Sequence, residues 1–339
     1  MKKRILIIEV NWLGDVLFST PFIRAVRDAD PEGYIACLTH PRTKEILEGN
    51  PAVNEILIYD EEGLHRGLSG KLKLILNLRR KHFDTVYILH RSFTKALMGY
   101  LSGAKERVGY PAKNRRMLLT KAAEEPEAGT HIAEYFLNLA GERPAAAKKP
   151  AYEFFINDAD RRYVKDYFSA RGISPGELLI TLCPGGNWGP KRWPGDSFAA
   201  LSDMLAAKYG AKIVITGSAK EKALADSIKG MMKHPAIVTC GGTNLKQLGA
   251  IFERSRLVVA NDTGSMHIAV AVGAKVLALF GPTSPEITGP YGKGNYRVVK
   301  SRIGCDIPCY DVTCNDNRCM KSISAEEVFA EAVDILNRK

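Results

Sequence analysis

The sequence predicts an α/β protein built from two consecutive Rossmann-like domains. Strands and amphipathic helices alternate through residue 140, and the alternation starts again with a strand at residue 178. Between these halves, residues 141–150 start with a Gly, are rich in Pro, Ala and Lys, and interrupt the pattern as a connector. We expect the two domains to face one another across a cleft, with a ligand at the carboxyl ends of both sheets.

The first domain is predicted to cover residues 1–157. Its first buried strand is an apolar run over 4–10, and 16–27 predicts a helix that Pro21 breaks in its second turn. The other predicted elements of this domain are strands over 34–38, 55–59, 85–89 and 152–156, and helices over 72–80 and 127–140.

The second domain is predicted to cover residues 158–323. Its predicted strands are 178–183, 212–216, 237–240, 257–260 and 276–280, and its predicted helices are 159–171, 196–208, 220–232 and 245–254. A capping box at Ser324–Glu327 begins a last amphipathic helix. Residues 324–339 are therefore assigned to a C-terminal segment, for which we expect packing back on the N-terminal domain.

The composition is that of an ordinary globular protein, with 45% hydrophobic and 25% charged residues. No apolar run reaches the length of a transmembrane helix. The apolar run after Met1–Arg4 is cut short by Glu9 and Asn11, which argues against a signal peptide. These features predict a cytoplasmic protein.

Positive charge is concentrated in one part of the chain. The formal net charge is +11, and the segment 63–121 alone holds fourteen Lys and Arg residues against two acids. Such a bias indicates a polyanionic partner, namely nucleic acid, anionic lipid or a phosphorylated glycan; the alternative is a solvated basic face with no partner. The candidate residues of this basic surface are Arg79, Arg80, Arg115 and Arg116.

A polar turn over 261–267 separates the predicted strand 257–260 from a short apolar helix. Free N–H groups and the helix dipole make such a turn an anion site, above all for phosphate. Its candidate residues are Asp262, Thr263 and Gly264. His267 follows Thr263 by one helical turn, and it is either a packing or capping residue or a further ligand contact.

Two other loops follow strands of the second domain. The loop over 184–194 contains three glycines and three prolines, and Lys191 and Arg192 in it can bind phosphate as a point charge and as a fork. Gly185, Gly186 and Asn187 support this loop. In the loop over 216–221, which includes Ser218, Glu221 either accepts hydrogen bonds from a ribose or is an exposed acid in the first turn of a helix. Neither a Walker sequence nor GxGxxG is present.

In the first domain, the segment 11–15 follows the first strand. Gly14 permits a tight turn, and Asp15 lies at the start of a helix, whose dipole favours an ionised carboxylate. Asp15 is therefore either a general base or only a helix cap.

Four cysteines lie close together near the C-terminus: Cys305, Cys309, Cys314 and Cys319. Their spacing lacks the paired CxxC units of a typical zinc site. A structural metal, disulfides and free thiols all remain open, although disulfides are the least expected in a reducing cytosol.

Taken together, the segments 11–21, 184–194, 261–267 and 280–285 resemble the lipopolysaccharide heptosyltransferases, the ADP-heptose-using glycosyltransferases of family 9 with the GT-B fold. The segment 184–194 is most similar to the heptosyltransferase II type. The resemblance implies an inverting transfer of heptose from ADP-heptose to the inner core of lipopolysaccharide, with no cofactor and no catalytic metal. It also implies an anionic lipid A–Kdo acceptor at the inner face of the cytoplasmic membrane, where the protein would bind peripherally, and no nucleic-acid partner.

The resemblance also implies roles for individual residues. Asp15 would be the general base, and Lys191 would bind the donor diphosphate together with Thr263 and Gly264. Asp262 and His267 would help to hold the donor sugar and phosphates, and Glu221 would contact the adenosine ribose.

Two alternatives differ in class. One is a GT-B enzyme that uses another nucleotide sugar, either a UDP-sugar transferase or an epimerase. The other is a basic nucleic-acid-binding protein, which is disfavoured because the sequence has no recognition motif of that kind.

Overall fold

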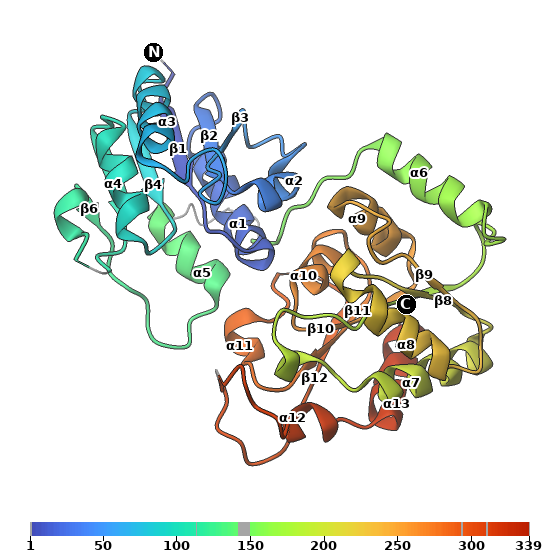
Figure 1. The fold of residues 1–339 in the computed structure, drawn as a ribbon. Coiled ribbons are helices and arrows are strands. Elements are labelled where there is room, and N and C mark those ends of the chain that lie inside the picture. Colours follow the sequence, from blue (N-terminus) through green and yellow to red (C-terminus); the bar gives the residue numbers. More distant parts are fainter. Residues whose placement is uncertain (1, 113, 142–149, 293, 310, 339) are drawn as a thin grey trace. The chain divides into compact units, whose positions relative to one another are not determined.

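The computed structural model describes residues 2–112, 114–141, 150–292, 294–309 and 311–338. Its contacts divide the chain into two compact units, Met1–Phe155 and Ile156–Lys339 (Figure 1). The division lies close to the predicted boundary after residue 157. Residues 142–149 of the predicted connector lie outside the described residues.

The first unit is built on a six-stranded parallel sheet with the order β3-β2-β1-β4-β5-β6. Its strands are β1 (Arg4–Ile8), β2 (Tyr34–Thr39), β3 (Glu55–Ile58), β4 (Thr85–Ile88), β5 (Glu106–Gly109) and β6 (Lys121–Ala122). Its helices are α1 (Leu13–Ala29), α2 (Lys44–Leu47), α3 (Leu68–Arg80), α4 (Phe93–Leu101) and α5 (Ile132–Leu137), with 3₁₀ turns η1 (Pro41–Thr43), η2 (Arg116–Leu118) and η3 (Asn138–Ala140).

The second unit has a second six-stranded parallel sheet, with the order β12-β11-β10-β7-β8-β9. Its strands are β7 (Leu179–Cys183), β8 (Lys212–Ile215), β9 (Ala236–Val238), β10 (Leu257–Asn261), β11 (Val276–Phe280) and β12 (Tyr296–Lys300). Its helices are α6 (Asp158–Ser169), α7 (Gly195–Tyr209), α8 (Lys222–Met231), α9 (Leu245–Arg254), α10 (Gly264–Ala271), α11 (Pro285–Thr288), α12 (Arg318–Lys321) and α13 (Ala325–Asn337), with 3₁₀ turns η4 (Gly189–Lys191) and η5 (Ala219–Glu221). Both units have the Rossmann strand order, so the predicted Rossmann-like topology is confirmed.

The central strands are mostly apolar, as expected for strands that helices cover on both faces of the sheet. In β8, Ile213 and Ile215 pack in the cluster that includes residues of α7, α8 and α13. Val214, between them, points to the other face and packs in the cluster that includes residues of α6 and α9. Alternate residues of a strand therefore belong to two different cores, which is why these strands appear in the sequence as unbroken hydrophobic runs.

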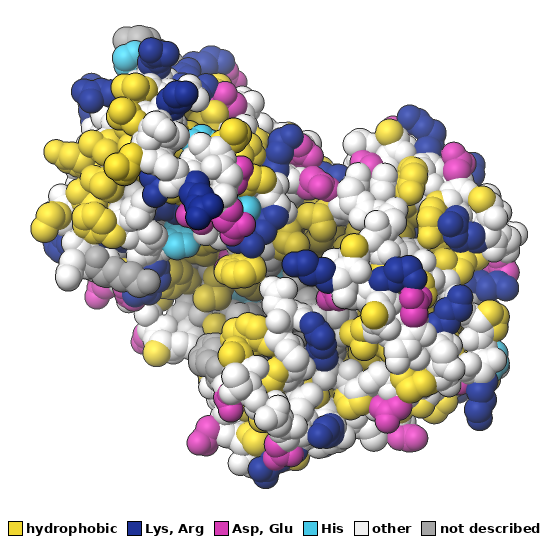
Figure 2. Space-filling model, in the orientation of Figure 1, with side chains coloured by type: hydrophobic (Ala, Val, Ile, Leu, Met, Phe, Trp, Pro, Cys, Tyr) yellow, Lys and Arg dark blue, Asp and Glu magenta, His cyan; other side chains and the backbone are white. Residues whose placement is uncertain are grey.

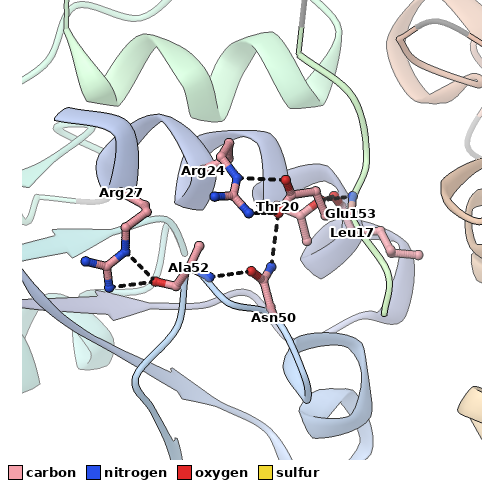
Figure 3. Close-up of polar contacts among 7 residues, drawn as sticks. All are labelled: Leu17, Thr20, Arg24, Arg27, Asn50, Ala52 and Glu153. Atoms are coloured by element: carbon pink, nitrogen blue, oxygen red, sulfur yellow. Dashed lines mark hydrogen bonds and ion pairs between the residues drawn. The ribbon is translucent and has the colours of Figure 1, made fainter. Parts of the chain in front are cut away.

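The predicted break at Pro21 does not occur, because α1 continues through it to Ala29. Proline has no N–H to donate to the carbonyl of Leu17, one turn earlier. The Thr20 hydroxyl donates to that carbonyl instead, at 2.7 Å (Figure 3). This local substitute keeps a buried carbonyl satisfied, so the helix remains intact.

The predicted strand over 152–156 is wrong, because this segment docks on α1 through side chains. The N–H of Glu153 donates to the Thr20 hydroxyl at 2.9 Å, and its carboxylate accepts from Arg24 and from Asn50 (Figure 3). A backbone donor that binds a helix side chain is not used in a strand ladder. The apolar residues Tyr152 and Phe154 are buried all the same, so the alternation that suggested a strand reflects burial alone.

The C-terminal helix α13 belongs to the second unit, where it packs against α7 and β12. Its buried residues Val328, Ala332 and Ile335 are part of the same hydrophobic cluster as β7 and α7. The apolar face that was expected to pack on the N-terminal domain is therefore used within the second unit.

Candidate functional site

In the second unit, the loops after β7 and β10 meet at the carboxyl ends of two neighbouring strands. Asn261, which is fully buried at the end of β10, links the two loops. Its Nδ2 donates to the carbonyls of Pro184 and Gly185 at 2.9 and 3.2 Å. Its Oδ1 accepts from the N–H of Trp193. This is the position where the strand order reverses, which is where open α/β sheets bind ligands. The sequence pointed to both loops but did not identify Asn261 as their link.

An ion pair stands at the centre of this region. The Lys191 Nζ lies 2.7 Å from Oδ2 of Asp262, which also accepts a hydrogen bond from the Thr283 hydroxyl at 2.8 Å. The Lys191 amine also lies 4.8 Å from the centre of the Trp188 ring. Asp262 is only 6% exposed, so its carboxylate holds the flexible lysine side chain in one place.

The N-terminus of α10 lies next to this pair. Thr263 is its N-cap residue, but its side chain makes no capping hydrogen bond, and its buried Oγ1 has no hydrogen-bond partner among the described residues. A Cβ added to Gly186 would lie 3.6 Å from Cγ2 of Thr263, so the glycine loop approaches the helix start closely. Gly264 begins the helix, and His267 is buried one turn later.

Glu221 connects the second and third predicted loops. Its Oε1 accepts from the N–H of Gly186 at 3.0 Å, and its Oε2 accepts from the N–H and hydroxyl of Ser218 at 2.7 and 2.9 Å. A Cβ on Gly185 would lie only 1.8 Å from that carboxylate. A side chain at position 185 would therefore displace the Glu221 carboxylate from these hydrogen bonds. Asn187 is exposed.

Arg192 is not placed to act as the predicted phosphate fork. Its Nε and Nη2 both donate to the carbonyl of Gly186, at 2.9 and 2.7 Å. The guanidinium therefore closes the loop on itself and fixes the position from which Lys191 extends. Of the two cations in the loop, Lys191 is the one at the candidate anion site.

The second unit thus brings together Lys191, Asp262, Thr263, Gly264 and the Gly186 loop. Two kinds of positive potential converge there, the Lys191 amine and the free N–H groups of the first turn of α10. An anion with several oxygens, such as a diphosphate, can accept from both.

The first unit holds the other predicted site residue, Asp15, in the first turn of α1 beside Gly14. The segment before it is held in position by Arg42, whose Nε donates to the carbonyl of Asn11 at 3.0 Å and whose guanidinium stacks on Trp12 at 4.4 Å. Because α1 follows β1 in the chain, Asp15 lies near the carboxyl end of β1, a central strand of its sheet. A carboxylate there suits an acid–base role.

Two buried ionisable residues beside this segment were not among the residues predicted from the sequence. Lys95, only 3% exposed on α4, donates from Nζ to the carbonyl of Glu9 at 2.8 Å and to Oδ1 of Asn11 at 2.5 Å. Glu9 is fully buried at the end of β1. Each is a single charged residue within an apolar stretch, and that pattern is the signal that points to a buried functional position.

Burial moves the pKa values of these two groups in opposite directions. It raises the pKa of Glu9 from 4.5 to about 8 and lowers the pKa of Lys95 from 10.5 to about 8. The stability contributed by Glu9 is fully present below pH 4.5 and is lost as the pH rises through about 8. The contribution of Lys95 is fully present above pH 10.5 and is lost as the pH falls through about 8.

Together, these two pH dependences predict that the combined contribution of Glu9 and Lys95 to stability is lowest near pH 8. Glu9→Gln, which stays neutral, is expected to flatten the fall in Tm between about pH 5 and about pH 8. The control is Glu62→Gln, at an exposed acid of the same unit, which should keep the wild-type slope. Parallel Tm curves for wild type and Glu9→Gln would contradict this expectation.

The structure divides the predicted basic surface. Arg79, Arg80 and Arg116 are exposed, but Arg115 is fully buried, so its assignment to this surface is wrong. Its guanidinium donates to the carbonyls of Tyr110, His90 and Ser92, which fixes the loops after β4 and β5. Burial also lowers the pKa of Arg115.

The four C-terminal cysteines are free thiols in the structure. Cys305 is exposed, Cys309 and Cys314 are half-buried, and Cys319 is buried in α12. Within the ranges that the structure describes, no three His, Cys, Asp or Glu side chains are grouped to bind a metal ion. The structure therefore leaves the predicted cysteine cluster without a metal-binding arrangement.

Comparisons with known proteins show the family and the fold of this chain. The profile of glycosyltransferase family 9 (heptosyltransferase) matches residues 71–318, a range that includes the whole of the second-unit site. The chain is 28% identical over 302 residues to lipopolysaccharide heptosyltransferase 2 of Escherichia coli, covering 85% of each protein.

Two solved structures are similar over nearly the whole chain. A family 9 glycosyltransferase from Veillonella parvula superposes with a TM-score of 0.91 at 25% identity, covering 99% of this chain and 98% of that one. The ADP-heptose lipopolysaccharide heptosyltransferase II of E. coli superposes with a TM-score of 0.82 at 25% identity and the same coverage. The GT-B class predicted for the two Rossmann-like domains is confirmed.

Proposed function

Because the chain belongs to glycosyltransferase family 9, the heptosyltransferases, we propose that it transfers heptose from ADP-heptose to the core of lipopolysaccharide. The observation that carries this proposal is the Lys191–Asp262 pair beside the N-terminus of α10. It offers a fixed cation and free backbone N–H groups at one place, which is what a departing nucleoside diphosphate requires.

In this proposal the second unit binds the donor. Lys191 and the N–H groups at Thr263 and Gly264 bind the diphosphate, and the unsatisfied Thr263 hydroxyl is available to donate to one of its oxygens. Asp262 orients Lys191, and His267 supports the donor from within α10. The Glu221 carboxylate accepts hydrogen bonds from the hydroxyls of the adenosine ribose, through the lone pairs that are not used by Gly186 and Ser218.

The chemistry is a single displacement that inverts the anomeric carbon. The acceptor oxygen attacks that carbon, the bond from the carbon to the phosphate oxygen breaks, and ADP leaves with the electron pair. Asp15 removes the proton from the acceptor hydroxyl as the new bond forms. Lys191 and the dipole of α10 stabilise the negative charge that develops on the leaving group. Each unit thus contributes one half of the chemistry.

The acceptor we propose is the anionic lipid A–Kdo core, presented at the cytoplasmic face of the inner membrane. The exposed cations Arg79, Arg80 and Arg116 would attract its phosphates and carboxylates. Arg115 has no part in this, because it is buried.

The proposal is tested by turnover of ADP-heptose with core acceptors that end at defined sugars. We expect release of ADP that depends on the acceptor, and calorimetric binding of ADP-heptose in preference to UDP-sugars. Binding or turnover of a UDP-sugar in place of ADP-heptose would instead identify an enzyme with another donor on the same fold.

A further inference from the structure

Helix α3 exposes a row of leucines to solvent. Leu68, Leu72 and Leu76 are four residues apart and therefore lie on one face of the helix, and they are 87%, 57% and 45% exposed. The opposite face is already used, because Leu74 and Leu78 are buried in the core of the first unit. The helix thus has a second apolar face that the folding of this unit does not require.

Neighbouring segments extend this row into a patch. Leu64, 80% exposed, lies just before α3, and the chain there crosses the helix so closely that a Cβ on Gly70 would lie 2.3 Å from the Leu64 carbonyl oxygen. Met117 in η2 is 81% exposed, and Tyr100 on α4 is also exposed. Figure 2 shows hydrophobic side chains gathered where Figure 1 places α3 and α4, with Lys and Arg side chains around them. Contiguous apolar patches on a protein surface usually mark a site of interaction.

The charge around the row has one sign only. No Asp or Glu occurs between Gly63 and Phe83, a stretch that contains six Lys and Arg residues. Lys71 and Lys73 lie on either side of the row beside Leu72, and Arg79 and Arg80 lie at the C-terminal end of the helix. None of these four cations forms an ion pair with an acid in the part of the chain that the structure describes.

We propose that α3, together with Leu64, is the membrane-docking element of this protein, with its leucines inserted at the interface of an anionic bilayer and its cations at the lipid phosphates. An apolar row flanked by unpaired cations is the pattern of a helix that lies in a membrane interface. Among the described residues, no helix is both long and apolar enough to span a membrane, so such a contact would be superficial. This inference rests on the proposed function, in which the acceptor is carried by a lipid.

A second copy of the chain fits this face less well than a bilayer. A symmetric pair would bring α3 against α3 and place the cations of one helix near those of the other, where their charges repel. Anionic headgroups supply the opposite charge to every cation of the helix at once.

The test is co-sedimentation of the full chain with vesicles of phosphatidylglycerol and phosphatidylethanolamine, and with neutral phosphatidylcholine vesicles. The variant carries Leu68→Ser, Leu72→Ser and Leu76→Ser, and the control carries Met231→Ser, a comparably exposed residue of the second unit. We expect the triple variant to bind anionic vesicles at least ~100-fold more weakly, and the control to bind like wild type. Added salt and the pair Lys71→Gln, Lys73→Gln should weaken wild-type binding without abolishing it.

If the triple variant bound anionic vesicles as tightly as wild type does, the proposal would be overturned. A wild-type dimer that the leucine substitutions convert to monomer while vesicle binding stays the same would also overturn it, because a second copy would then cover the face. Turnover of ADP-heptose with a soluble, deacylated core acceptor is measured in parallel and should be equal in wild type and triple variant. Absence of turnover in the wild type would contradict the proposed function alone, whatever the vesicles show.

Discussion

Replacing Asp15 with alanine is expected to lower kcat by roughly 10²–10⁴-fold while the affinity for ADP-heptose changes little. We expect little change in donor affinity because Asp15 lies in the first unit, in the first turn of α1, whereas the proposed donor-binding residues belong to the second unit. Loss of a general base slows the attack of the acceptor oxygen and leaves the contacts to the diphosphate in place. The measurement is kcat under saturating ADP-heptose, together with donor Kd by calorimetry.

Asp28→Ala is the matched control for this variant. Asp28 is an exposed acid on the same helix, near its C-terminal end. It should leave both kcat and donor affinity unchanged. Near-normal turnover by Asp15→Ala would remove Asp15 from the mechanism and leave it with the role of a helix-terminal acid.

Lys191→Met is expected to lower kcat by roughly 10²–10³-fold and to weaken donor binding as well. The substitution removes the cation from the leaving-group site. Among the described residues, it also leaves the buried Asp262 carboxylate with only the Thr283 hydroxyl as a side-chain partner. Removing one partner of such a buried pair costs about 3 kcal/mol of stability. Lys229→Met, at an exposed lysine of α8 outside the site loops, is the control for loss of a charge.

A double variant, Lys191→Met with Asp262→Asn, separates the two effects. Asparagine removes the unpaired negative charge, so most of the lost Tm should return. Activity should not return, because the site still lacks its cation. Recovery of both together would mean that Lys191 acts only on the structure of the loop.

The sequence predicted the central strands of both sheets because they are apolar on both faces. The missed strands Glu106–Gly109 and Tyr296–Lys300 carry charged residues, and they lie next to a sheet edge and at a sheet edge, respectively. Helix α4 (Phe93–Leu101) was also missed, and it is only nine residues long. Local patterns are weakest where an element is short and only one face is buried.

Candidate site residues could be predicted where a polar loop follows an apolar strand, as at Lys191 and Asp262. Their direct pairing could not, since they are separated by 71 residues in the chain. The same limit explains Arg115, which appeared to be one more cation of a basic segment. Only the fold shows that three carbonyl groups surround its guanidinium.

By itself, the sequence determined the family, the two Rossmann-like units and the loops that hold the candidate site residues, because strand periodicity and loop composition are local properties of the chain. The tertiary structure decided which charged groups are buried, which are paired and which stay exposed. In the structure, Glu9 and Lys95 are buried ionisable groups. Arg192 closes its own loop by hydrogen bonds, and the leucines of α3 form an exposed apolar surface. Burial and pairing depend on residues that are distant in sequence and adjacent in space, and for that reason no local pattern contains them.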